Sequence, residues 1–142
     1  MKNRILVASL ALVFSAGVAS ADDMDGDAGK GLKRFKKDTC SVCHAVGPGA
    51  ADKKMEGPTL NGIIGRKMAS IEGYEYSDAL KAKGAAGEVW TKEAVFEYLK
   101  DPSKFLGGKS KMTKKVKKAS RRGDLVTYLA GIKEDGSGAD AK

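Results

Sequence analysis

Both cysteines and the only histidine of this 142-residue chain lie within five consecutive positions, Cys40-Ser41-Val42-Cys43-His44. Residues of these types at this spacing can form a redox disulfide, supply part of a metal site, or anchor a covalently attached group. The elements around the pentapeptide and the other ligand candidates decide among the three.

The context argues against a redox disulfide and against zinc. A redox Cys-x-x-Cys normally lies where a strand meets a helix, and no segment shows a convincing alternating strand pattern. A structural zinc site needs four ligands, whereas the chain supplies three here and has no second cluster. A structural disulfide between Cys40 and Cys43 would close too short a loop to stabilise much, because the effect grows with loop length.

The pentapeptide is instead typical of c-type haem attachment. Two thiols three positions apart can form thioethers with the two vinyl groups of haem. The next residue, His44, then lies beneath the iron as a proximal ligand. The pattern predicts one haem c per chain, covalently bound through Cys40 and Cys43.

The sixth iron ligand must be Met, Lys, water or nothing, since the only histidine is used. Met24 lies close to the start of the mature chain, and Met55 and Met68 suit solvent contact or gap filling in a long loop. Met112 lies 68 residues after His44, in an expected extended segment, far enough to reach the opposite haem face. Its thioether would stabilise ferrous iron and raise the potential.

The first 21 residues have the order of a secretory signal peptide. Lys2 and Arg4 precede an apolar run at 5–14 and a small-residue cleavage pattern at 19–21. The run is shorter than the roughly 20 residues of a spanning helix, which disfavours an uncleaved anchor. We expect cleavage, a periplasmic location, and a mature chain of residues 22–142 with no transmembrane anchor.

Charge and composition narrow the classes of molecule that the chain could bind. The net charge of the whole chain is +8, and loss of Lys2 and Arg4 lowers it to +6. Aromatic residues make up only 6%, so a large apolar cofactor would help to fill the core of this single domain. Residues 109–122 contain eight basic residues and no acid: Lys109, Lys111, Lys114, Lys115, Lys117, Lys118, Arg121 and Arg122. Export and the absence of interleaved aromatics argue against nucleic acid, which leaves a solvated face, an anionic membrane, or an acidic protein surface.

The apolar periodicity predicts an all-α fold of four to five short helices with long loops. Helices are expected over 27–37, over 77–84 with Gly84 as the stop, over 91–101 with Thr91 as cap and Pro102 beyond the end, and from Ser120, as cap, to Gly131. Residues 45–77 and 105–118 are expected to be loops, and residues 133–142 a disordered tail.

Several motifs in one order resemble the class I c-type cytochromes, relatives of mitochondrial cytochrome c, and most closely the bacterial cytochrome c2 group. They are "CSVCH", "GPTLNGIIGRK", "GYEYSDALKAKG", "WTKEAVFEYLKDP", "KFLGGKSKM" and "DLVTYLA". The resemblance covers residues 26–132. It implies the class I cytochrome c fold, with Met112 as the sixth ligand.

The resemblance also implies a haem environment. A carbonyl near Pro58 would accept the Nδ1–H of His44 and orient the ring, and the Tyr98 hydroxyl would lie near the Met112 sulfur. Residues that match those bonded to a buried haem propionate are Arg66, Tyr76, Trp90 and Ser110. Without the resemblance, Pro58 is a turn proline, and Trp90 and Tyr98 are ordinary core aromatics.

A contact between the first and last helices is implied as well, with Gly31 and Phe35 meeting Leu125 and Tyr128. One departure from the family pattern concerns the haem edge: Lys114 stands where the family usually has a bulky aromatic. This change implies a wetter edge, a lower potential or a looser Met112 segment, and leaves the ligands in place.

These features predict a monomeric, soluble electron carrier rather than an enzyme. By resemblance, its donor is a cytochrome bc complex and its acceptor a photosynthetic reaction centre or a terminal oxidase, reached through acidic surfaces that the lysines of 109–118 would dock against. The alternatives are a haem-based gas or ligand binder with an open sixth site, and an enzyme such as a small peroxidase or the haem subunit of a dehydrogenase.

Overall fold

The computed structural model of the chain describes residues 24–140, so the predicted signal peptide lies outside the described residues. The described part is helical, and its one strand-like feature is an isolated bridge between Lys67 and Val89. The elements are α1 (Ala28–Lys37), α2 (Cys40–Cys43), the 3₁₀ turn η2 (Ala50–Asp52), α3 (Asp78–Ala85), α4 (Lys92–Lys100), α5 (Pro102–Leu106) and α6 (Ala119–Ala130). No helix within residues 24–140 has the length and apolarity to cross a membrane. The expected all-α class is confirmed.

Side-chain caps fix where the helices begin, as expected from the sequence for α1 and α4. The Asp27 carboxylate accepts a hydrogen bond from the Lys30 N–H at 2.6 Å, and the Thr91 hydroxyl accepts one from the Ala94 N–H at 3.0 Å. Each cap satisfies a backbone donor that has no partner inside the helix.

Two predicted helix boundaries are wrong. α3 runs one residue past Gly84, to Ala85, so Gly84 lies inside the helix. A Cβ at Gly84 would lie 2.3 Å from the Met68 carbonyl oxygen, so lack of space accounts for the glycine there. The left-handed residue that follows the helix is Gly87, with φ +83°. At α6 the N-cap is Lys118, whose side chain makes no capping bond, while Ser120 already lies inside the helix. α2 and α5, both short, were not expected at all.

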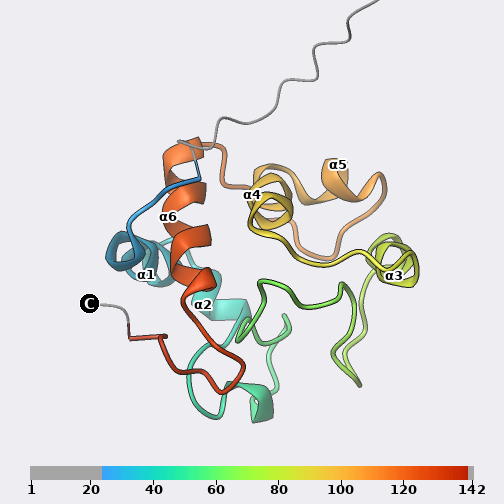
Figure 1. Cartoon of the computed structure of the whole chain (residues 1–142). Helices are drawn as coiled ribbons and strands as arrows, with labels where there is room; N and C mark the ends of the chain where they lie inside the picture. The colour runs from blue at the N-terminus through green and yellow to red at the C-terminus, as the bar shows by residue number, and fades with distance from the viewer. Residues whose placement is uncertain (1–23, 141–142) are drawn as a thin grey trace, which may run out of the picture.

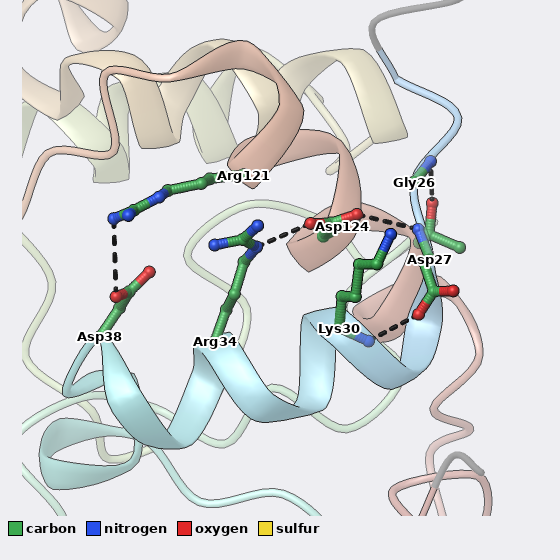
Figure 2. Close-up of polar contacts among 8 residues, drawn as sticks. Gly26, Asp27, Lys30, Arg34, Asp38, Arg121 and Asp124 are labelled. Carbon is green, nitrogen blue, oxygen red and sulfur yellow. Dashed lines mark hydrogen bonds and ion pairs between the residues drawn. The ribbon is translucent and has the colours of Figure 1, made fainter.

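α1 and α6 cross at close range on one side of the molecule (Figure 1). A Cβ at Gly31 would lie 2.1 Å from the Asp124 carbonyl oxygen, so only glycine lets the two backbones approach this closely. One turn later, the rings of Phe35 and Tyr128 pack with centroids 5.8 Å apart. The contact implied by the resemblance is therefore present, and Figure 2 shows the polar bonds along its edge.

Residues 133–140, expected to be disordered, are instead folded into turns against the domain. Ala139 is buried and its carbonyl accepts the Tyr128 hydroxyl at 2.9 Å. The backbone of Gly136 packs directly on Gly47, which leaves no room for a side chain at Gly136. The polar composition of residues 133–140 gives no sign of this packing, because the packing depends on backbone contacts and on two small residues, Gly136 and Ala139.

Candidate metal centre

Cys40 and Cys43 lie on the single turn of α2, which begins after Thr39 in the left-handed conformation. Both thiols are free and half-buried. Burial raises the pKa of the Cys40 thiol, and the negative charge of Asp38 raises it further, against a smaller lowering by Lys114. The turn thus holds two thiols one helical turn apart, with the surface-exposed Val42 between them.

His44 follows the turn with an extended backbone, and its ring orientation is fixed from two sides. The Nδ1 atom lies 2.8 Å from the Pro58 carbonyl oxygen, the hydrogen bond expected from the resemblance. The edge of the ring lies against Gly57, where a Cβ would be 2.4 Å from the His44 Cε1 atom. The Gly57 N–H in turn donates to the Cys43 carbonyl at 2.8 Å.

This arrangement leaves the other ring nitrogen available. None of the hydrogen bonds made by residues 24–140 uses the His44 Nε2 atom. Burial lowers the pKa of the imidazole more than the Pro58 hydrogen bond raises it, which favours the neutral ring. A neutral imidazole with one nitrogen bonded to a carbonyl is the form that ligates metals.

Met112 lies half-buried against the core, in the segment between α5 and α6. Its N–H donates to the Ser110 hydroxyl at 3.1 Å, and that hydroxyl also shares a hydrogen bond with the Tyr98 hydroxyl at 3.2 Å. Tyr98 packs edge-on against Trp90, with ring centroids 5.0 Å apart. Three residues predicted for the haem environment therefore form one chain of contacts, from Trp90 through Tyr98 to Ser110, that ends at the Met112 backbone.

Arg66 and Tyr76 belong to a second group. The Arg66 guanidinium donates to the carbonyls of Thr59 at 2.8 Å and Asn61 at 3.1 Å. The Tyr76 hydroxyl accepts the Ile71 N–H at 3.3 Å. Burial lowers the pKa of Arg66 and raises that of Tyr76. Both groups come from the loop between η2 and α3 and are tied to its backbone.

Sequence reasoning missed the residues that hold this long loop. The buried Asn61 side chain accepts the Gly47 N–H and donates to the Gly47 carbonyl, each at 2.9 Å. The Tyr74 hydroxyl donates to the Glu56 carbonyl at 2.6 Å. Asn61 and Tyr74 lie inside two of the motifs that carry the resemblance, "GPTLNGIIGRK" and "GYEYSDALKAKG", so these motifs were the sequence signal that could have identified them. Met68 is fully buried, so it fills a gap in the core, which is one of the two roles expected for it.

The six lysines of 109–118 are all exposed, but they are not equivalent. Lys115 pairs with Asp101 at 2.7 Å, and Lys111 donates to the Glu75 carbonyl. A surface hollow of about 280 Å³ is lined by Asp38, Lys114, Lys115, Val116, Lys117, Lys118 and Arg121. Cationic groups dominate this face beside α2.

Comparison with known proteins decides the family. The chain is 47% identical to cytochrome c-550 of Ancylobacter novellus over 108 residues, which cover 76% of this chain and 97% of the relative. It is 40% identical to cytochrome c2 of Blastochloris viridis over 125 residues, covering 88% and 91%. The chain belongs to the class I c-type cytochromes. A comparison with protein-family models finds no match.

Solved structures of class I c-type cytochromes share the fold. Cytochrome c2 from Rhodospirillum centenum aligns with a TM-score of 0.70 at 37% identity, covering 76% of this chain and 99% of that one. Cytochrome c2 from Rhodopseudomonas palustris aligns at 0.67 and 38%. The class I cytochrome fold expected from the motifs is thus confirmed.

Proposed function

We propose that this class I cytochrome is a soluble periplasmic electron carrier with one covalently bound haem c. The observation that carries the proposal is the geometry at α2. Two free thiols lie on one helical turn, and His44 follows at once with Nδ1 bonded to the Pro58 carbonyl and Nε2 without a partner in the described part of the chain. Haem iron, when bound, supplies a one-electron couple between its ferrous and ferric states.

In this proposal Cys40 and Cys43 form the thioethers, and His44 and Met112 are the axial ligands. The Pro58 carbonyl keeps the proton on Nδ1 and so keeps Nε2 available as a donor to iron. The Ser110 hydroxyl fixes the Met112 backbone, and Tyr98 orients that hydroxyl. These bonds are made by the protein alone, so the ligands need little rearrangement when haem binds.

We assign Arg66, Tyr76, Trp90 and Ser110 to the haem propionates. The Tyr76 hydroxyl accepts one backbone hydrogen bond and keeps its own proton to donate. The half-buried Arg66 guanidinium has no carboxylate within ion-pair distance among residues 24–140. A propionate would supply the charge that this cation lacks, and unpaired buried charges are costly.

The proposed partners are acidic docking surfaces of membrane redox complexes: a cytochrome bc complex as donor, and a reaction centre or terminal oxidase as acceptor. The exposed lysines beside α2 support this, because α2 carries the predicted thioethers and electrons would leave near them. The carrier would work as a monomer, with short-lived encounters steered by charge.

The visible absorption spectrum tests the proposal. We expect the purified protein to be low-spin and inert to carbon monoxide. The ferric form should have a methionine-to-iron band that disappears in Met112→Ala. A high-spin spectrum or rapid binding of carbon monoxide to the wild type would refute the electron carrier and favour the ligand-binding alternative.

A further inference from the structure

The segment that carries Met112 is fixed at both ends, and its second anchor has no assigned role. The first anchor is Ser110, whose N–H donates to the Ser103 hydroxyl at 3.2 Å. The second lies four residues after Met112, where the buried Val116 donates its N–H to the Leu99 carbonyl at 2.7 Å. The residues between Met112 and Val116 are exposed.

Arg122 completes the second anchor. Its Nη1 atom donates to the Val116 carbonyl at 3.0 Å and to the Lys117 carbonyl at 2.7 Å. Its guanidinium carbon lies 4.2 Å from the centroid of the Phe96 ring. Arg122 therefore joins three elements: the Met112 segment, α4 through Phe96, and α6, on which it lies.

The position is an unfavourable one for arginine. Arg122 is only 4% exposed, its Nε atom has no hydrogen-bond partner, and no carboxylate pairs with it among the described residues. It also places a cation in the first turns of α6, where the helix dipole disfavours positive charge. A buried, unpaired cation lowers the free energy of unfolding, and an apolar side chain would fill the same space without that desolvation cost.

We infer that Arg122 is a positioning residue that sets how firmly Met112 is held in place. It does so by fixing two consecutive carbonyls just after the ligand, so that the segment cannot swing outward without breaking both charge-assisted bonds. The inference rests on the proposed role of Met112 as an iron ligand. It assigns no contact between Arg122 and the haem.

The test compares Arg122→Met with Tyr128→Phe in the ferric holoprotein. Arg122→Met removes the donors but fills the space. Tyr128→Phe removes the buried hydrogen bond from the Tyr128 hydroxyl to the Ala139 carbonyl. Tyr128 lies near the C-terminal end of α6, whereas Arg122 lies near its start, beside the Met112 segment. Cyanide is the probe, because it binds iron only after Met112 has left. We expect cyanide to bind Arg122→Met roughly tenfold faster than wild type, with a weaker methionine-to-iron band, and Tyr128→Phe at the wild-type rate.

Unfolding in guanidinium separates positioning from a general loss of stability. If both variants bind cyanide faster in proportion to the stability each has lost, Arg122 is merely structural and the inference fails. Equal cyanide rates for Arg122→Met and wild type also overturn it. Should Arg122→Met not fold, Arg122→Lys takes its place. Lysine keeps a charged donor for the two carbonyls, but its side chain is shorter and lacks the planar guanidinium that packs on the Phe96 ring, so an intermediate rate is expected. A wild type that lacks the methionine band would instead refute the proposed function.

Discussion

At the scale of single residues, the position of the His44 ring depends on the absence of a side chain at Gly57. A Cβ at Gly57 would lie 2.4 Å from Cε1 and 2.6 Å from Nδ1, so the ring occupies the place of a side chain. Gly57 does not adopt the left-handed conformation, and its role is therefore space rather than backbone freedom. The same absence allows the Nδ1 atom to reach the Pro58 carbonyl.

Gly57→Ala should lower the free energy of unfolding of the holoprotein by roughly 1–3 kcal/mol, the usual cost of overpacking a filled site. The added methyl group has to displace the His44 ring or the Cys43 carbonyl, since both lie within 3 Å of it. Denaturant titration measures the change. Gly131→Ala is the matched control, because its Cβ would meet nothing closer than 3.4 Å and its φ is −80°. Equal losses in the two variants would contradict the packing argument.

At the scale of elements, Asp124 fastens the start of α1 to α6 (Figure 2). Its carboxylate accepts the Asp27 N–H at 3.0 Å and the Arg34 Nε–H at 2.6 Å, and its side chain is 10% exposed. Burial raises the pKa of this carboxyl, but the Asp27 hydrogen bond and the Arg34 charge outweigh it, and the pKa falls below its ordinary value.

The lowered pKa makes this contact sensitive to acid. A carboxyl whose pKa is lower in the folded state stabilises the fold above its unfolded pKa and loses that contribution as pH falls through the folded value. Asp124→Asn should therefore cost roughly 1–3 kcal/mol near pH 7, with the difference from wild type shrinking below about pH 4. Urea unfolding at several pH values measures it. Asp52→Asn removes the same charge at an exposed position outside the ion pairs of residues 24–140 and serves as the matched control. A pH-independent difference for Asp124→Asn would rule out the carboxylate as the cause.

The elements show which parts of the fold could be predicted from sequence. Asp27 and Thr91 cap their helices as expected, because capping is a local interaction between neighbours in the chain. Gly84 lies inside its helix rather than after it, and the glycine is required there by the carbonyl of Met68, which is far away in the sequence. The pentapeptide and the His44–Pro58 bond were likewise accessible from motifs. The buried Arg122 was not, because the run of lysines around it suggests only an exposed face.

At the scale of the whole molecule, positive charge gathers on the face that carries α2. Lys114 is close enough to Cys40 to lower the pKa of its thiol slightly. Lys111 and Lys115 are engaged with Glu75 and Asp101, so reversing them would also disturb local structure. Lys114 and Lys117 are exposed and make no ion pair within the described part of the chain, which makes them the cleaner probes of steering.

Reversing both charges, Lys114→Glu with Lys117→Glu, should slow oxidation of the reduced protein by a purified bacterial terminal oxidase roughly tenfold at low salt. The difference should shrink as salt screens the encounter, and stopped-flow kinetics over a range of ionic strength measure it. The control, Lys53→Glu with Lys54→Glu, makes the same change in net charge at exposed positions beside η2. Steering by a local patch slows only the first variant, because the encounter depends on where the charge lies. If both variants are slowed alike, the overall charge governs the encounter, and the lysines beside α2 are not a docking surface.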